Sequence, residues 1–400
     1  MLVAVVRRIH YRFPILFEME EPALTYWLQL MFMISCGIIL IPILLYPLAL
    51  FLLGLLFPRG RKHSFKELPF VSVMVAARNE EKCIGQRIRN LLDQDYPVEK
   101  IEILVASDSS TDSTDEIIRS FDNSRVRFVR SEERLGKSSL MVKLSKIARG
   151  DILVFTDANT SFRSNTVTEL VMPFADPRVG CVDGSKQNSL AQETCESTYW
   201  KYEQQLKALG SRLGAVLGAT GAVFAVRKDL YDPVNPSRAD DFETAVSTRI
   251  KGYSCLYNPD AVAAEPTPDN SSQYSRLVRI VSWMIGSAFS LLWKSIKNGR
   301  IGLALQLVIH KILRWNMGIF AILASISGLA LGFSDGPLNS VFLSVIGFYL
   351  LVIVGWKSTS RLPSVIKMPY FFWLMCAASL KGVFVAVSAK SAAIWDPGTR

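Results

Sequence analysis

The sequence has few cysteines and no regular cysteine pattern. It contains six cysteines, none of them in a C-x-x-C pair, and Cys36 and Cys376 lie inside apolar segments. Disulfide frameworks and structural zinc sites need regularly spaced cysteines, so both are excluded, and the pattern indicates a reducing, cytosolic environment. The chain also lacks internal repeats, heptads and low-complexity tracts, which argues against a repeat protein or a coiled coil.

Charge is missing from residues 24–57, and apolar residues are in excess both there and in residues 301–394. The run at 26–57 is longer than the roughly 20 residues that span a bilayer, so it predicts one long tilted helix or, as the alternative, a tight helical hairpin. In the second region we expect spans at 316–333 and 341–356, and a span or re-entrant segment at 369–387. The stretches 282–296 and 303–313 combine apolar residues with tryptophan and basic residues, which is typical of interfacial helices.

Residues 64–280 carry the charge of an ordinary globular domain and alternate between strand and helix signals, which predicts an α/β fold. The sequence therefore divides into 1–63, with an N-terminal interfacial segment and a transmembrane helix; 64–280, a cytosolic domain; and 281–400, with interfacial and transmembrane helices. The net charge of +10 comes largely from basic residues beside the apolar segments, such as Arg59, Arg61 and Lys62. The cytoplasmic bias of such loops explains them without a nucleic-acid partner and predicts a multi-pass protein of the cell membrane.

Three apolar strands in the central domain end in polar side chains. In open α/β sheets, ligands bind beyond the carboxyl ends of the strands, so these side chains are expected to share a ligand site. The alternative is an α/β fold whose strand ends are merely polar. The side chains follow strands predicted at 70–77, 101–107 and 152–155, and they are Arg78, Asn79 and Glu80; Asp108; and Asp157 and Asn159.

Two of these positions favour binding of a metal and an anion. Asp157 and Asn159 offer oxygen ligands, which suit Mg or Mn; a solvated turn is the alternative. Lys137 follows Gly136 at the start of a predicted helix, where a cation is unfavourable unless an anion such as phosphate also lies there. The alternative is a solvent-exposed Lys137 that binds no anion.

Two later stretches are candidates for the rest of a site. Residues 217–226 are rich in small side chains ahead of an apolar strand, which suits either the close approach of a bulky ligand or a tightly packed turn. Residues 239–244 place Asp240, Asp241 and Glu243 in the first turn of a helix predicted to reach about residue 251. These acids are either favourable charges at a helix start or a source of a catalytic base.

Together these motifs resemble the membrane glycosyltransferases of family 2, the group with hyaluronan, chitin, cellulose and poly-N-acetylglucosamine synthases. The resemblance covers residues 71–279 and implies a GT-A domain, a Rossmann-like nucleotide-diphospho-sugar transferase fold, inserted between transmembrane and interfacial helices. In this family the D-x-D motif holds the metal and the diphosphate; here it reads Asp157-Ala158-Asn159, so metal ligation by Asp157 and Asn159 and Mg or Mn as cofactor are implied. The resemblance further implies donor nucleotide binding by Ala76, Arg78, Asn79, Glu80, Asp108, Lys137 and Asp157.

The same resemblance implies the remaining site residues. Asp241 matches the final acid of the T-E-D or G-D-D motif, the base that deprotonates the acceptor hydroxyl, and a single base without a protein nucleophile gives inversion. Arg276 and Arg279 match an R-x-x-R-I form of the signature that holds the diphosphate, and Leu277 stands where processive members have tryptophan. The acceptor side is implied to include Gly218, Thr220, Gly221 and Asp240.

The expected function is a membrane-embedded inverting glycosyltransferase that moves a hexose from a nucleotide sugar, a UDP-sugar in the first instance, to a growing polysaccharide. One alternative is transfer of a single sugar to a polyprenyl phosphate or another lipid acceptor. Another is a catalytically silent subunit of a synthase complex. The expected partners are the donor, a glycan or lipid-linked acceptor, membrane lipids, and a second copy or an export partner.

Overall fold

The computed structural model describes residues 21–57, 64–188, 195–232, 240–265, 273–333, 339–357 and 363–388. The described residues fall into two compact units: a helical unit within the ranges 1–45 and 313–380, and a sheet unit within the ranges 46–312 and 381–400. The predicted N-terminal interfacial segment and the basic cluster at 59–63 lie outside the described residues.

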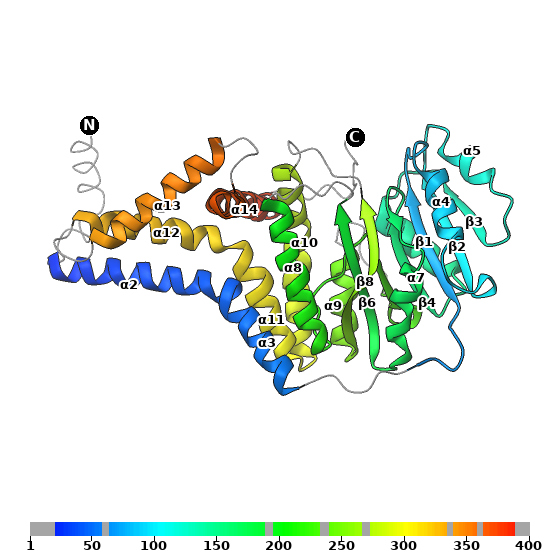
Figure 1. Ribbon diagram of the computed structural model, residues 1–400, viewed down its shortest axis with the longest axis horizontal. Helices are drawn as coiled ribbons and strands as arrows, with labels where there is room; N and C mark the ends of the chain where they lie inside the picture. Colours follow the sequence, from blue (N-terminus) through cyan, green and yellow to red (C-terminus); the bar gives the residue numbers. More distant parts are fainter. Residues whose placement is uncertain are drawn as a thin grey trace. The chain divides into compact units, whose positions relative to one another are not determined.

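In the part of the sheet unit that the structure describes, eight strands form one sheet in the order β3-β2-β1-β4-β7-β6-β8-β5 (Figure 1). Its first half, β3 to β4, is entirely parallel, whereas β7 runs antiparallel to both β4 and β6. The predicted α/β fold is therefore confirmed, with a parallel first half and a mixed second half. The strands are β1 (Val71–Ala77), β2 (Ile101–Asp108), β3 (Val126–Ser131), β4 (Ile152–Asp157), β5 (Ser161–Phe162), β6 (Val179–Asn188), β7 (Phe224–Arg227) and β8 (Ser254–Glu265).

Strands β1, β2 and β4 are buried on both faces, as their largely apolar sequences predict, whereas β3 at the edge of the sheet is mostly half-buried. Along β1, Val73 and Val75 belong to one hydrophobic core and Met74 to the other. The first core is completed by α4 (Ile84–Leu92), α5 (Thr114–Arg119) and α7 (Thr166–Val171). The second is completed by α6 (Lys137–Ile147) and α9 (Asp240–Ile250). Both faces of the sheet are thus closed, and the carboxyl ends of the strands remain as the place for a ligand.

Longer helices complete the sheet unit. α8 (Cys195–Arg212) packs against β8, α3 (Tyr46–Leu56) packs against α8, and α10 (Gln273–Lys297) is followed by α11 (Ile301–Leu307) and a π-helix, η7 (Val308–Leu313). Tyr46 at the start of α3 accepts a hydrogen bond from Gln306 Nε2 at 2.7 Å. Short 3-10 turns complete the unit, at η3 (Val98–Lys100), η4 (Met172–Ala175) and η5 (Lys228–Leu230).

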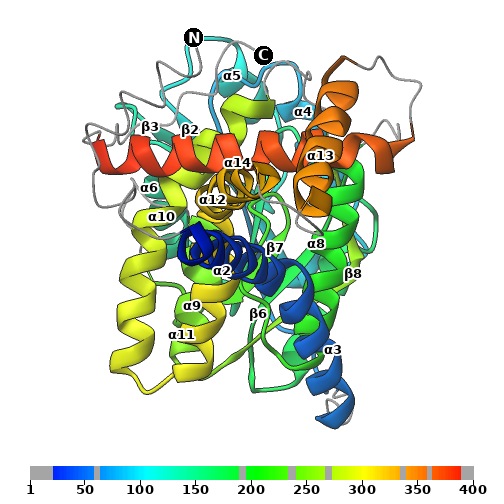
Figure 2. The ribbon, with the colours of Figure 1, turned by 90° about the vertical axis from the view of Figure 1, so that its left-hand side faces the viewer.

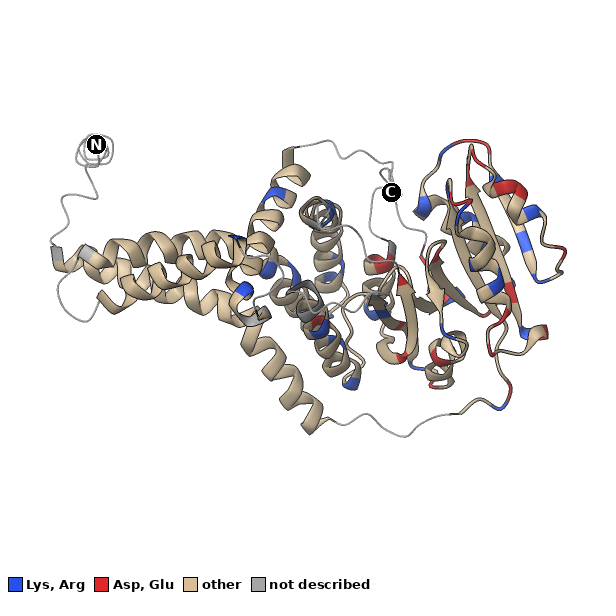
Figure 3. Ribbon diagram, turned by 45° about the horizontal axis from the view of Figure 1, so that its top comes forward, with Lys and Arg blue, Asp and Glu red and all other residues tan. Residues whose placement is uncertain are grey.

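The helical unit carries few charged residues (Figure 3). α12 packs against α2 and α13 (Figure 2), and an added Cβ at Gly328 of α12 would lie 2.7 Å from Val345 of α13, so glycine permits this close helix contact. The elements are α2 (Glu21–Leu40), the π-helix η2 (Ile41–Leu45), α12 (Met317–Ala330), the 3-10 turn η8 (Leu331–Phe333), α13 (Asn339–Lys357) and α14 (Ser364–Ser388), whose last residues belong to the sheet unit.

Among the described residues, four helices are long and apolar enough to cross a membrane: 22–56, 274–297, 339–357 and 366–388. The pair 301–313 and 317–330, bent by 57°, would make a fifth if it counts as one span. Residues 22–56 form one candidate span rather than the hairpin considered as an alternative. Helix 274–297 includes the stretch predicted to be interfacial and also meets the length and composition of a span.

Candidate active site

The carboxyl ends of β1, β2 and β4 meet in register, because Ala76 pairs with Ala106 on one side and with Asp157 on the other. The loops after β1 and β2 are tied together by hydrogen bonds. Arg78 Nη1 donates to the carbonyl of Asp108 at 2.8 Å, and the side-chain oxygen of Asn79 accepts from the Thr111 N–H at 2.9 Å. The Glu80 N–H donates to Thr114 Oγ1 at 2.8 Å. The predicted donor-side residues of these two strands therefore lie in one cluster.

Asn79 and Ser109 in these loops have left-handed backbone conformations, with φ of 52° and 55°. Side chains other than glycine adopt this conformation at a cost, and such residues are concentrated at functional sites. Asn79 is exposed and its side chain is held by the second loop. The strained backbone thus occurs in both loops at the predicted nucleotide site.

Asp108 shapes the loop that leads to Lys137. Its side chain is buried, and its two carboxylate oxygens accept hydrogen bonds from the Leu135 N–H at 2.7 Å and the Gly136 N–H at 3.0 Å. Gly136 has φ of 82°, a conformation that favours glycine. The structure therefore gives Asp108 a role in loop geometry, and its contact with the donor nucleotide stays a prediction.

Lys137 opens α6 and pairs with Asp157 at the end of β4. Its Nζ lies 2.5 Å from Asp157 Oδ1 and donates to the carbonyl of Gly221 at 3.4 Å. Both side chains are about one-third exposed. The sequence predicted an anion near Lys137, and in the structure a carboxylate from a neighbouring strand supplies negative charge at that place.

A second cation, Arg87 of α4, lies behind Asp157 and was not predicted. Its guanidinium is buried, donates to Thr156 Oγ1 at 2.6 Å and stacks 4.2 Å from the ring centre of Phe162. Burial lowers the pKa of Arg87 to about 9, and the carboxylate of Asp157 opposes this shift. Asn90 on the same helix bonds both the N–H and the carbonyl of Phe162, each at 2.8 Å. α4 thus fixes the turn at residues 157–162.

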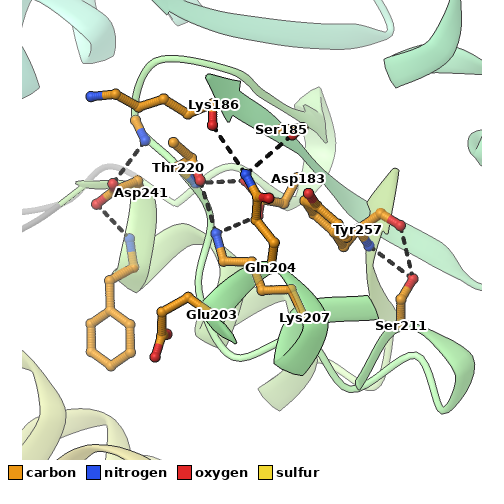
Figure 4. Close-up of polar contacts among 12 residues, drawn as sticks. Asp183, Ser185, Lys186, Glu203, Gln204, Lys207, Ser211, Thr220, Asp241 and Tyr257 are labelled. Atoms are coloured by element: carbon orange, nitrogen blue, oxygen red, sulfur yellow. Dashed lines mark hydrogen bonds and ion pairs between the residues drawn. The ribbon is translucent and has the colours of Figure 1, made fainter. Parts of the chain in front are cut away.

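Asp241, the predicted base, lies in the first turn of α9. Its Oδ2 accepts from the Gly221 N–H at 2.9 Å and its Oδ1 from the Phe242 N–H at 2.8 Å (Figure 4). An added Cβ at Gly221 would lie 3.1 Å from Oδ2, so the small residue permits this close approach. Asp240 begins the same helix, and its side chain lies outside the described part of the structure.

The small-residue stretch 217–226, predicted to contact the acceptor, is hydrogen-bonded through Thr220 to two residues that were not predicted from the sequence. Asp183 of β6 accepts the Thr220 N–H at 2.7 Å, and Lys207 of α8 donates to Thr220 Oγ1 at 2.8 Å (Figure 4). The two side chains form an ion pair at 2.6 Å. Burial raises the pKa of Asp183, an effect that Lys207 opposes. Burial also lowers the pKa of Lys207, but the Asp183 carboxylate outweighs this, so the pKa is raised overall.

Two groups of predicted residues are less closely tied to this cluster. Gly218 lies beside Phe242: an added Cβ at Gly218 would be 3.4 Å from the Phe242 ring. Arg276 and Arg279 lie one turn apart on α10, as predicted, and the Arg279 guanidinium lies 5.9 Å from the ring centre of Trp283. Diphosphate binding by the two arginines stays a prediction.

The described residues contain no group of three or more histidine, cysteine or acidic side chains that fits a metal ion. Asp157 and the half-buried Asn159 nevertheless offer a carboxylate and an amide oxygen in one fixed turn. Mg is commonly held by one or two carboxylates together with substrate phosphates, so a two-residue protein site fits a metal completed by the donor. The residues present are therefore compatible with Mg or Mn.

Comparison with known proteins identifies the family of this domain. Residues 72–233 match the profile of Glycosyl transferase family 2. The chain contains a glycosyl transferase family 2 domain. This confirms, for residues 72–233, the resemblance to family 2 glycosyltransferases that the motifs indicated.

Curated relatives match the chain in part. Over 198 residues it is 31% identical to a beta-monoglucosyldiacylglycerol synthase of Nostoc sp., covering 44% of this chain and 41% of the relative. It is 27% identical over 251 residues to the probable glycosyltransferase YdaM of Bacillus subtilis, with 59% of each covered. An N-acetylglucosaminyltransferase of Rhizobium meliloti is 27% identical over 232 residues, covering 53% and 54%. The chain thus spans about half the length of the curated relatives it matches.

A solved structure resembles most of the chain. The mannosyltransferase PcManGT from Pyrobaculum calidifontis, determined with GDP-Man and Mn²⁺, matches with a TM-score of 0.68 and 21% identity, covering 90% of this chain and 99% of that one. At this identity the likeness establishes the fold. It confirms the predicted GT-A domain flanked by apolar helices.

Proposed function

We propose that this chain is a membrane-embedded, inverting hexosyltransferase that uses a nucleotide sugar and a divalent cation. One observation carries the proposal: Gly221 joins the two halves of the site. Its N–H donates to the base Asp241, and its carbonyl accepts from Lys137, which is paired with Asp157. Base and metal-binding carboxylate are therefore both tied to one residue, as attack and departure at one sugar carbon require.

In the proposed reaction, Asp241 takes the proton of an acceptor hydroxyl as that oxygen attacks the anomeric carbon of the donor sugar. The bond from that carbon to the diphosphate breaks with its electron pair leaving on the phosphate oxygen, and a single displacement inverts the anomeric centre. A divalent cation held by Asp157 and Asn159 would neutralise the charge on the leaving diphosphate. Lys137 would add a second positive charge beside it.

The loops after β1 and β2 would hold the nucleotide. Arg78, Asn79 and Glu80 are hydrogen-bonded to Asp108 and the residues after it, at the carboxyl ends of two parallel strands, where open α/β sheets bind their ligands. We propose a UDP-sugar as donor and a growing polysaccharide as acceptor. The similarity to N-acetylglucosaminyltransferases supports a glycan product.

A second acceptor class is also supported. Leu277 replaces the tryptophan of processive members, and one relative is named as a synthase of a glucosylated diacylglycerol, so transfer of a single sugar to a lipid is the alternative. The four long apolar helices among the described residues suit a membrane location for either acceptor, and we propose that the catalytic domain lies on the cytoplasmic side.

The test is a transfer assay with full-length protein in lipid nanodiscs, Mn²⁺ and a panel of radiolabelled UDP- and GDP-hexoses. Labelled products that lengthen with time support the polysaccharide, and a single labelled lipid supports the alternative. Nucleotide binding without turnover on any donor would instead support a silent subunit and contradict the proposed activity.

A further inference from the structure

We propose that the buried Asp183–Lys207 ion pair is a positioning device for the catalytic base, acting through the Thr220–Gly221 turn and touching neither substrate. The inference rests on the proposed role of Asp241 as base. Neither Asp183 nor Lys207 belongs to the motifs that the sequence singled out.

Asp183 and Lys207 hydrogen-bond Thr220 from two different elements, β6 and α8. Asp183 on β6 is fully buried, and its two carboxylate oxygens bond the Thr220 N–H at 2.7 Å and Lys207 Nζ at 2.6 Å. Lys207 on α8 also donates to Thr220 Oγ1 at 2.8 Å (Figure 4). Hydrogen bonds to ionised groups are shorter and about twice as strong as neutral ones, so the backbone and hydroxyl of Thr220 are firmly fixed.

The next residue of the turn transmits this position to the catalytic groups. The Gly221 N–H donates to Asp241 Oδ2 at 2.9 Å, and its carbonyl faces Lys137 Nζ at 3.4 Å. The turn itself is closed by the Val223 N–H, which donates to the Thr220 carbonyl at 2.8 Å. A shift of Thr220 would therefore move the hydrogen-bond donor of the base and the acceptor of Lys137 together.

Small displacements at this point carry a large kinetic effect, because misplacing a reacting group by about 1 Å costs on the order of 100-fold in rate. The donor site proper is held by other contacts, between Asp108 and the loop before Lys137 and between Arg87 and Thr156. Loosening the Asp183–Lys207 pair should thus slow turnover while leaving nucleotide binding nearly unchanged.

The sheet provides a matched control for a buried carboxylate without this role. Glu102 is also fully buried and paired, with Arg127 at 2.9 Å and Arg149 at 3.0 Å, but it lies near the start of β2, at the opposite end of the strands from Asp157. Glu102→Gln therefore perturbs a buried ion pair of the same sheet without touching the turn.

The experiment compares Thr220→Val, the double variant Asp183→Asn with Lys207→Gln, and Glu102→Gln, all in the full chain. Thr220→Val removes one acceptor of Lys207 and leaves the ion pair intact; the double variant removes both charges, so no lone charge is buried. We expect kcat to fall about 10- to 100-fold in the first two, with KM for the donor and Kd for UDP within about twofold of wild type. Glu102→Gln should lower the melting temperature. At assay temperatures below that melting temperature, its kcat should equal that of the wild type.

A further comparison separates positioning from general damage. In the Asp241→Asn background the base is already lost, so Thr220→Val should cause no additional loss of the residual turnover, because residues that act as a unit are not additive. Wild-type kcat in Thr220→Val, or a parallel loss of UDP affinity, would overturn the inference, and so would an equal kcat loss in Glu102→Gln. Wild-type turnover of Asp241→Asn itself would instead remove the proposed base. If the double variant does not fold, Thr220→Val decides alone.

Discussion

Replacing Asp157 with Asn should abolish the part of nucleotide binding that depends on metal. Asp157 is the only charged ligand in the proposed metal turn, and its Oδ1 lies 2.5 Å from Lys137 Nζ. Interactions with a charged group contribute about 1.5–3 kcal/mol, and about 1.4 kcal/mol corresponds to a factor of ten, so the affinity for UDP in the presence of Mn²⁺ should fall about 10- to 100-fold.

The same substitution should affect metal-free binding differently. In Asp157→Asn, Lys137 loses its carboxylate partner, and its ammonium becomes available to the diphosphate of UDP. We therefore expect the affinity for UDP without metal to stay the same or to increase. Isothermal titration calorimetry of UDP with and without Mn²⁺ measures both quantities.

Asp151 offers a matched control, because it immediately precedes β4, at the opposite end from Asp157, and is exposed. Asp151→Asn should leave both UDP affinities unchanged. A wild-type protein with the same UDP affinity with and without Mn²⁺ would refute the reasoning, and so would an Asp157→Asn variant that keeps the full gain from Mn²⁺.

Three further predictions follow from the same contacts. Asn159→Asp restores the second acid of the metal motif and should tighten Mn²⁺ binding severalfold by calorimetry; unchanged binding would show that residue 159 is not a ligand. Gly221→Ala places a Cβ 3.1 Å from Asp241 Oδ2 and should lower kcat about tenfold with unchanged UDP affinity, whereas wild-type kcat would show that the turn adapts freely. Burial raises the pKa of Glu102, but bonds from Ser72, Arg149 and Arg127 lower it by more, below the ordinary 4.5. The stability it contributes is present above pH 4.5 and is lost as the pH falls through the lowered pKa, so Glu102→Gln should show a weaker loss of melting temperature on acidification, and an unchanged acid dependence would contradict the assignment.

The strand ends could be predicted because the information is local. A buried parallel strand is an unbroken apolar run, and the residue that ends it is visible in the sequence, as Asp108 and Asp157 show. The helix start at Lys137 was found in the same way. Neighbouring parallel strands end at the same edge of the sheet, which is why Ala76 lies beside Asp157. A common site for the residues at these strand ends could therefore be predicted.

The supporting residues could not be predicted because their roles depend on pairing between distant segments. Arg87 lies on a helix with alternating polar and apolar residues, where an arginine normally points to solvent, and only the folded chain brings it to Thr156. Asp183 and Lys207 are 24 positions apart, on a strand and a helix, and neither position has a local pattern that marks an ion pair. The direction of β7 could not be predicted for a related reason, since strand direction is not encoded in its apolar pattern.

The most direct test of the account is the kinetics of Asp241→Asn with the labelled donor, combined with the Kd for UDP. If Asp241 takes the proton of the acceptor, kcat should fall about 10²- to 10⁴-fold while the Kd for UDP stays within about twofold of wild type. Near wild-type turnover in this variant would contradict the central claim that Asp241 is the base of an inverting sugar transfer.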